Sequence, residues 1–171
     1  TKSEITLAPG CSTIFTEFSS CTLTGEGDGY VTVRDSLIND YDNFSGIAHQ
    51  TMINGTITLA GNTACHFLDC FSGVPGQGTP TIDGGGAGGS GFASRNYNGG
   101  IKVENVTDAI DVSMDMNSGQ IVLDGTVTAG TFVLRGISKL TDNSGGTATV
   151  DSSDLINELI RTMQLDVTDI V

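Results

Sequence analysis

Short apolar runs separated by turn residues recur along most of this chain. Residues 119–142 read GQIVLDGTVTAGTFVLRGISKLTD, in which β-branched and aliphatic residues alternate with polar ones and glycine interrupts them about every ten residues. Alternation of apolar and polar residues is typical of strands with one buried face. A chain that repeats a short strand and turn in this way stacks its strands into a solenoid, in which each layer packs on its neighbours.

The pattern predicts a series of short strands along the whole body of the chain. In order, they cover residues 14–18, 21–24, 30–33, 56–59, 65–71, 81–83, 100–106, 110–116, 120–123 and 131–134. Within 110–116 the apolar residues share one parity, and Asp111, Ser113 and Asp115 share the other. One face of this strand is therefore predicted to be buried and the other solvated.

An all-β fold follows from these strands, and two architectures are compatible with them. Two or three strands per coil would build a parallel β-helix, and this is the solenoid that we expect for residues 11–150. A β-sandwich is the alternative, because it also has short strands at a spacing of about 8–12 residues. Asn-Gly and Asp-Gly pairs, which suit the tight hairpins of a sandwich, occur at 28–29, 54–55, 83–84, 98–99 and 124–125.

The two ends of the chain differ from this body. Residues 1–10 are interpreted as a polar lead-in that closes at a Pro-Gly turn. From residue 151 the apolar residues recur at helical spacing, so residues 151–171 are predicted to form a short C-terminal amphipathic α-helix. The candidate oligomerisation residues on this helix are Ile156, Leu159, Ile160, Met163, Val167 and Ile170. The pattern leaves open whether the helix forms a seam between copies or packs on the end of the solenoid as a cap.

Composition and charge narrow the possible partners. The chain has 171 residues, enough for one domain, and its 24 glycines are about twice the average usage, as many turns require. It carries 7 Lys and Arg against 20 Asp and Glu, a formal charge of −13. Such a field repels phosphate backbones and anionic lipid surfaces, so we expect no nucleic-acid partner. No apolar stretch approaches about 18 residues, so we expect no membrane insertion.

Four cysteines are candidates for disulfides. Cys11 and Cys21 are ten residues apart, which matches the strand spacing and predicts a stabilising bond between equivalent positions. Cys65 and Cys70 differ by an odd number, so in an unbroken strand they point to opposite faces and one is available to a partner chain. The alternative is that all four are small, buried, reduced thiols.

The sequence contains few candidate catalytic or metal-binding residues. The group from Cys65 through His66 to Cys70 superficially offers metal ligands, but zinc sites usually need two ligand pairs at turn spacing. We therefore expect no metal and no cofactor, with His66 facing solvent. Asp111 and Asp115 lie on one strand face with roughly 13 Å between their α-carbons, which is long for an acid and base acting on one bond. We interpret them as surface acids and predict no enzymatic activity.

Three segments resemble virion proteins of tailed bacteriophages. Residues 69–83 read DCFSGVPGQGTPTID, residues 95–103 read RNYNGGIKV, and residues 115–136 read DMNSGQIVLDGTVTAGTFVLRG. The likeness extends over roughly residues 65–150. Such proteins are fibre, spike, neck or capsid-decoration components, commonly trimeric, with β-helical shafts and no bound cofactor.

The resemblance implies a non-enzymatic structural part of the virion. On this hypothesis three copies form a spike, fibre section or decoration that links other virion proteins, assembles in the host cytoplasm and ends in the extracellular particle. Interchain disulfides or the terminal helix would lock the copies together. The alternative is a tailspike module that binds or depolymerises a host-surface carbohydrate. A bacterial surface adhesin is a third hypothesis.

Overall fold

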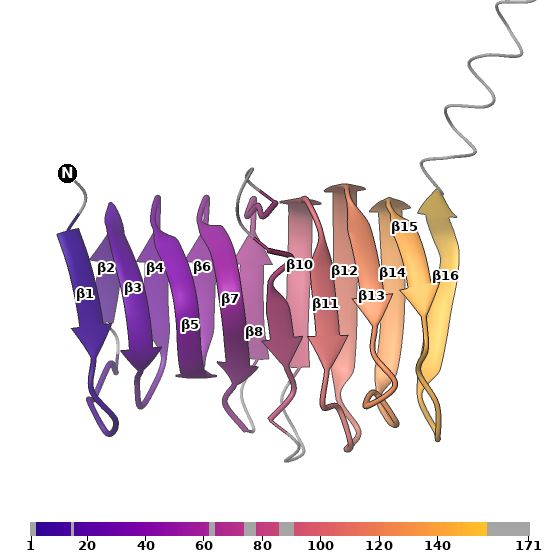
Figure 1. Ribbon diagram of the computed structural model, residues 1–171, viewed down its shortest axis with the longest axis horizontal. Coiled ribbons are helices and arrows are strands. Elements are labelled where there is room, and N and C mark those ends of the chain that lie inside the picture. Colours follow the sequence, from indigo (N-terminus) through magenta and orange to yellow (C-terminus); the bar gives the residue numbers. More distant parts are fainter. Residues whose placement is uncertain (1–2, 15, 62–63, 74–77, 86–90, 157–171) are drawn as a thin grey trace, which may run out of the picture.

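The computed structural model stacks the alternating strands into two facing sheets (Figure 1). The structure describes residues 3–14, 16–61, 64–73, 78–85 and 91–156. Within these residues the chain winds through about seven turns of a β-solenoid, and successive strands alternate between the two sheets. The stack is long in one direction because each turn is added beside the previous one.

Each sheet contains strands of one parity in chain order. The first sheet consists of β1 (Ser3–Leu7), β3 (Cys21–Glu26), β5 (Leu37–Phe44), β7 (Met52–Leu59), β9 (Thr81–Asp83), β11 (Ile101–Glu104), β13 (Gln120–Leu123) and β15 (Lys139–Asp142). The second consists of β2 (Thr16–Ser19), β4 (Val31–Arg34), β6 (Gly46–His49), β8 (Ala64–Leu68), β10 (Gly91–Asn98), β12 (Asp111–Ser118), β14 (Thr131–Ile137) and β16 (Thr149–Ile156). We call them the odd and the even sheet.

All strand pairs between these named elements are parallel. The two sheets face each other as in a sandwich, but a sandwich joins neighbouring strands by antiparallel hairpins. The all-β parallel solenoid predicted from the sequence is therefore confirmed, and the β-sandwich alternative is wrong. The Asp-Gly pair at 83–84 marks the end of β9, where the chain leaves the odd sheet rather than closing a hairpin.

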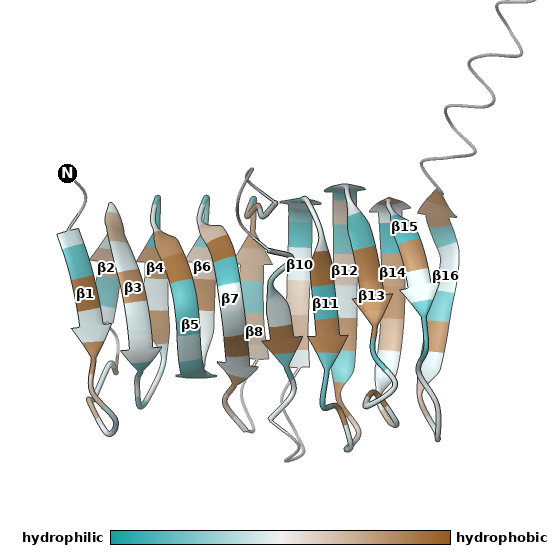
Figure 2. Cartoon of the chain, viewed as in Figure 1, coloured by the Kyte–Doolittle hydropathy of each residue, from teal (hydrophilic) through white to brown (hydrophobic). Residues whose placement is uncertain are grey.

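Inward side chains of equivalent strands stack directly on one another. Leu23, Ile38 and Ile53 occupy one register position of β3, β5 and β7, and each is at most 1% exposed. Aromatic rings continue this packing through the middle turns, where the ring centroids of Phe44 and Phe67 lie 5.6 Å apart. Figure 2 shows the resulting alternation of hydrophobic and hydrophilic bands along the strands. One continuous apolar core therefore runs along the axis.

Residues in the left-handed conformation form a corner at the end of the even strands. Ser20, Asp35, Gln50 and Asp69 follow β2, β4, β6 and β8 and have φ angles of 56°, 49°, 49° and 54°. The backbone N–H of each donates a hydrogen bond to a carbonyl oxygen of the next turn. This conformation costs most residues energy, so its repetition marks a corner that the stack itself enforces.

The first strand corrects one expectation. Residues 1–10 were predicted to be a lead-in, but β1 (Ser3–Leu7) pairs in parallel with β3 and completes the odd sheet. Ile5 and Leu7 lie at the same parity as the inward Leu23 of β3 and pack against the core. The strand β1 is short and lies at the edge of the sheet, and its polar residues obscure the alternation of apolar and polar positions in the sequence.

The last strand corrects another expectation. The predicted helix over 151–171 does not begin at residue 151, because β16 (Thr149–Ile156) extends the even sheet beside β14. The rest of the predicted helix lies outside the described residues. None of the described residues forms a helix long and apolar enough to cross a membrane.

Candidate functional site

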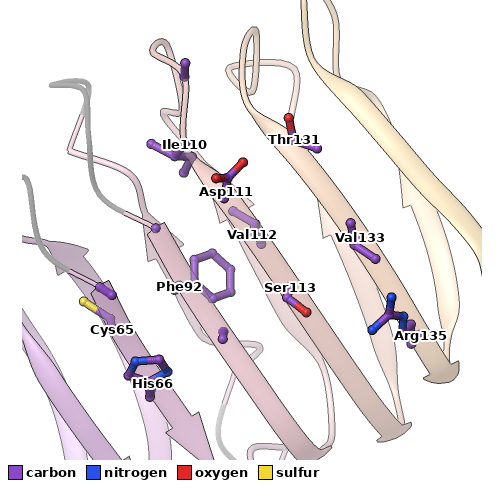
Figure 3. Close-up of a pocket in the computed structure, with 14 residues that line it drawn as sticks. Cys65, His66, Phe92, Ile110, Asp111, Val112, Ser113, Thr131, Val133 and Arg135 are labelled. Atoms are coloured by element: carbon purple, nitrogen blue, oxygen red, sulfur yellow. The ribbon is translucent and has the colours of Figure 1, made fainter.

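An open groove crosses the outer face of the even sheet, over β8, β10, β12 and β14 (Figure 3). Its volume is about 570 Å³. The hollow forms because outward positions on two neighbouring strands carry small residues, namely Ala64 on β8 and Gly91 and Ala93 on β10. A Cβ at Gly91 would lie 2.6 Å from the carbonyl oxygen of Asp111, so this part of the floor requires glycine.

Polar side chains border the apolar floor of the groove. Asp111 and Thr131 are register partners on β12 and β14, and both are exposed. Figure 3 shows them at one end of the groove, with Arg135 towards the other end of β14 and His66 on β8 across the floor. A carboxylate, a hydroxyl, a guanidinium and an imidazole around an apolar surface suit a ligand with C–H faces and hydroxyl groups, such as a sugar.

The two aspartates singled out from the sequence share the outer face of β12, as the alternation predicts. Asp111 lines the groove, whereas Asp115 lies farther along the strand as the register partner of Arg135. At strand rise their α-carbons are roughly 13 Å apart. Carboxylates that act together on a glycosidic bond are about 5–9.5 Å apart. The fold therefore does not bring these two side chains together as an acid–base pair.

A cluster of charges surrounds Asp69 at the even-strand corner. The Asn96 side chain donates a hydrogen bond to its carboxylate at 2.8 Å, His49 Nε2 lies 3.3 Å away and Arg95 Nη2 lies 4.0 Å away. The hydrogen bond from Asn96 is the main cause that lowers the pKa of Asp69, and the charge of Arg95 adds to it. These groups come from β6, the corner after β8, and β10, so the cluster ties three turns together along one edge.

Acidic side chains form a column on the outer face of the odd sheet. Five carboxylates lie at one register position of the odd sheet: Glu26 on β3, Asp42 on β5, Asp83 on β9, Glu104 on β11, and Asp124 directly after β13. On β7, between Asp42 and Asp83, the same position is occupied by Thr58. Neighbouring strands are about 4.8 Å apart, so most of these charges repel one another. Lys102 offsets part of this repulsion by pairing with both Glu104 and Asp124.

The pKa values of Lys102 and Asp124 are shifted by their contacts within the acidic column. The Lys102 Nζ lies 3.1 Å from Asp124 Oδ2. Hydrogen bonds to Glu104 and then Asp124 raise the pKa of Lys102. The pKa of Asp124 is lowered mainly by a hydrogen bond from the backbone N–H of Thr126, and next by one from the side chain of Lys102. No group of three or more His, Cys, Asp or Glu side chains among the described residues is placed to hold a metal ion.

The cysteines form no intrachain disulfide, so the predicted bond between Cys11 and Cys21 is wrong. Cys11 is exposed, whereas Cys21 is buried and pairs in register with Ser3 of β1. The prediction equated the ten-residue strand spacing with one turn. One turn contains two strands here, and the hydrogen bond between the equivalent corners at Cys21 and Ser36 spans 15 residues.

The prediction that Cys65 and Cys70 point to opposite faces is also wrong, because both are fully buried. The strand β8 ends at Leu68, and the left-handed Asp69 then turns the chain so that Cys70 points inward. Their thiols donate hydrogen bonds to the carbonyl oxygens of Phe44 and Ala48, at 3.1 and 3.3 Å. Burial raises the pKa of Cys65 to about 11 and that of Cys70 to about 12.

Among the oligomerisation candidates, the structure describes Ile156 at the end of β16, where it is 54% exposed. Leu159, Ile160, Met163, Val167 and Ile170 lie outside the described residues.

Sequence reasoning missed the groove, although it placed His66 on the outward face of its strand, where it borders the hollow. The available signal was the pair of small residues at alternate positions, Gly91 and Ala93, but the residues beside them on neighbouring strands depend on the register. Comparisons with family models, with curated proteins and with solved structures found no match for this chain.

Proposed function

We propose that this chain is a non-enzymatic structural protein of a tailed-bacteriophage particle. Three copies form a spike, fibre section or decoration that links other virion proteins. The observation that carries the proposal is the uninterrupted parallel stacking of both sheets from β1 and β2 to β15 and β16. The resemblance of residues 65–150 to such virion proteins is the support for a virus particle as the setting.

The stack is expected to resist stretching and bending along its long axis. Backbone hydrogen bonds between parallel strands run along the long axis, and one apolar core follows them from turn to turn. Stretching or bending the molecule must therefore break many bonds together. The acidic column and the net charge of −13 keep neighbouring shafts apart in solution.

Two measurements test this proposal. Antibodies raised against the chain should label intact virus particles in electron micrographs, and the native mass in solution should be that of three chains. The mass is measured with and without reductant, because Cys11 is exposed and a bond between copies at this residue would make the trimer sensitive to reduction. Particles that carry no label would overturn the structural role, and a single-chain mass would overturn the trimer.

The groove supports a second candidate function, the binding of a host-surface glycan. Its apolar floor accepts the C–H face of a sugar, while Asp111, Thr131 and Arg135 offer hydrogen-bonding groups to the hydroxyls. The carboxylate at Asp111 is the anchor we expect to matter most, since hydrogen bonds to a charged group contribute about 1.5–3 kcal/mol.

The two aspartates of β12 provide a matched test of this second function. Binding of bacterial surface polysaccharide is measured by calorimetry for the unaltered chain, Asp111→Ala and Asp115→Ala. Glycan binding at the groove predicts a loss of about tenfold or more for Asp111→Ala and little change for Asp115→Ala, which is on the same face but outside the groove. Equal losses, or no binding by any form, would exclude this site. Release of new reducing ends would indicate cleavage as well.

A further inference from the structure

The groove over the even sheet contains a carboxylate whose charge is not compensated. Asp111 and Arg135 both border the groove. The guanidinium is already paired, because Arg135 Nε lies 3.6 Å from Oδ2 of Asp154. Among the described residues, the side chain of Asp111 accepts no hydrogen bond and lies in no ion pair. The groove therefore offers an incoming ligand an unpaired negative charge.

The apolar floor lies directly beside this carboxylate. Ala64 and Gly91 are register partners on β8 and β10, and Gly91 approaches the backbone of Asp111 on β12. On the other side, Thr131 is the register partner of Asp111 on β14. One row across four strands thus places two side chains too small to obstruct a ligand, a carboxylate and a hydroxyl in succession (Figure 3).

The charges around Asp111 have mostly the same sign. The outer faces of β12, β14 and β16 carry one guanidinium, that of Arg135, and four carboxylates, those of Asp111, Asp115, Asp151 and Asp154. Asp151 is the register partner of Val133, which lines the groove. Hydrogen bonds from Ser153 lower the pKa of Asp151, so this residue is charged in neutral solution. Because the fields of these charges add, this part of the face attracts cations and repels anions.

The strands beneath the groove have no free edge. Each of β8, β10, β12 and β14 lies between two other strands of the even sheet, with which its backbone groups pair. A peptide that binds a sheet gains much of its affinity from main-chain hydrogen bonds at an edge strand, and this groove offers no such edge. Recognition here depends on an apolar surface and on side chains at its border, which suits a sugar ring with its C–H face and its polar substituents.

We propose that the groove binds a glycan with free amino groups, and that one protonated amine contacts the carboxylate of Asp111. The inference rests on the second candidate function, glycan binding at this groove, and it names the class of sugar. The C–H face of the ring lies over Ala64 and Gly91, and a hydroxyl group reaches Thr131. An acidic glycan is disfavoured because its carboxylates would meet Asp111 and the acids of the neighbouring strands.

Calorimetric titration of the full chain with three glycan oligomers of equal length tests this inference. The oligomers consist of glucosamine, which carries amines, N-acetylglucosamine, which is neutral, and galacturonic acid, which is anionic. At low ionic strength and about pH 6, where the amines and the carboxylates are both charged, the glucosamine oligomer should bind about fivefold or more tighter than the neutral one. The galacturonic acid oligomer should bind most weakly. Added salt should reduce these differences, because it screens interactions between charges.

Two substitutions separate the local charge from the net charge. Asp111→Asn and Glu26→Gln each remove one negative charge, but Glu26 lies on the outer face of the odd sheet. Asp111→Asn should lower the ratio of glucosamine to N-acetylglucosamine affinity to about twofold or less. Glu26→Gln should leave this ratio as it is in the unaltered chain. A ratio that is the same in all three proteins would overturn the contact between the amine and Asp111.

The remaining outcomes distinguish this inference from the function on which it rests. If the neutral oligomer binds as tightly as the glucosamine oligomer, the groove binds glycans without a preference for amines, and this inference alone is overturned. If none of the three glycans binds, glycan binding at the groove is overturned with it. A lysine oligomer of the same length that binds as tightly as the glucosamine oligomer would show attraction to positive charge alone and would overturn the sugar site. Particle labelling and native mass test the virion role separately.

Discussion

The backbone N–H of Cys21 donates a hydrogen bond to Oγ of Ser36 at 3.1 Å, across one turn of the solenoid. The same Ser36 hydroxyl donates to the carbonyl oxygen of Arg34 at 2.6 Å. Thr51 occupies the equivalent corner one turn later, and its hydroxyl donates to the carbonyl oxygen of His49 at 2.9 Å. Small polar residues therefore close this inner corner, where larger side chains would not fit and apolar ones would leave amides unpaired.

Replacing Ser36 with alanine should destabilise the chain. The substitution leaves the N–H of Cys21 buried without its acceptor, because Ser36 is only 3% exposed. We expect the free energy of unfolding to fall by about 1–3 kcal/mol, measured by urea denaturation. Ser113→Ala, on the exposed face of β12, is the control and should change it by less than about 0.5 kcal/mol. Equal effects of the two substitutions would contradict the role of this corner.

Gly46 lies where a side chain would have no room beside the neighbouring turn. Its φ angle is +140°, and a Cβ added there would overlap the carbonyl oxygen of Val31 on the neighbouring strand. Gly46→Ala should lower the free energy of unfolding by about 2–4 kcal/mol, because the backbone must separate β4 from β6. The matched control is Gly78→Ala, where an added Cβ meets no atom within 4 Å. Unfolding midpoints that coincide for both variants would show that the sheet adjusts freely at Gly46.

The acid side of the pH–stability profile should depend on Asp124. Its pKa is lowered in the folded chain, so its contribution is present above the unfolded pKa of about 3.9 and is lost as pH falls through the folded value. Asp124→Asn should therefore lower the urea midpoint at pH 7, and the difference from the unaltered chain should shrink in strongly acidic solution. Lys102 has a raised pKa, so its charge persists from pH 4 to about 8 and adds no slope there.

The control for this experiment is Asp111→Asn, at an exposed position in the groove. It removes one negative charge outside the cluster around Lys102 and so controls for the change in net charge. Urea midpoints are measured from about pH 2.5 to pH 7 at constant ionic strength, since surface pairs weaken in salt. A constant offset between Asp124→Asn and the unaltered chain over the whole range would contradict the linkage.

Thiol reactivity should separate one cysteine from the other three. Cys11 is exposed, whereas Cys21, Cys65 and Cys70 are buried. Because burial raises the pKa of Cys65 and Cys70, both remain neutral thiols at pH 8, and the neutral form reacts poorly. Iodoacetamide should add one label to the native chain, at Cys11, and four in denaturant, as counted by intact mass and peptide mapping. Native labelling at Cys65 or Cys70 would show that the core opens at this turn.

Alternation along the chain was enough to predict much of the fold. Within 110–116 the parity of apolar residues matched the buried face of β12, and the predicted bounds of β9 and β13 agree with the structure in full. Several strands escaped prediction, however, including β5 and β10. Left-handed residues interrupt the alternation in both, at Asp40 and Asn96, so the apolar parity changes within the strand.

The local pattern also could not decide between strand and helix at residues 151–156. Leu155 and Ile156 fit a helical series that runs on into the following residues. Pairing with β14 satisfies the backbone groups of this segment along an existing sheet edge. Because that edge is supplied by β14, one turn earlier in the chain, only the assembled structure selects the strand.

The sequence by itself determined that the strands are short, amphipathic and stacked, because a side chain's burial depends on its parity within a strand. Only the tertiary structure decided which residues became neighbours across turns. The turns differ in length, since hydrogen bonds between equivalent corners span 15 residues from Cys21 to Ser36 and 27 from Asp69 to Asn96. Loop lengths set this register, so the groove over β8 and β10 and the corner at Ser36 follow from the packing of whole turns.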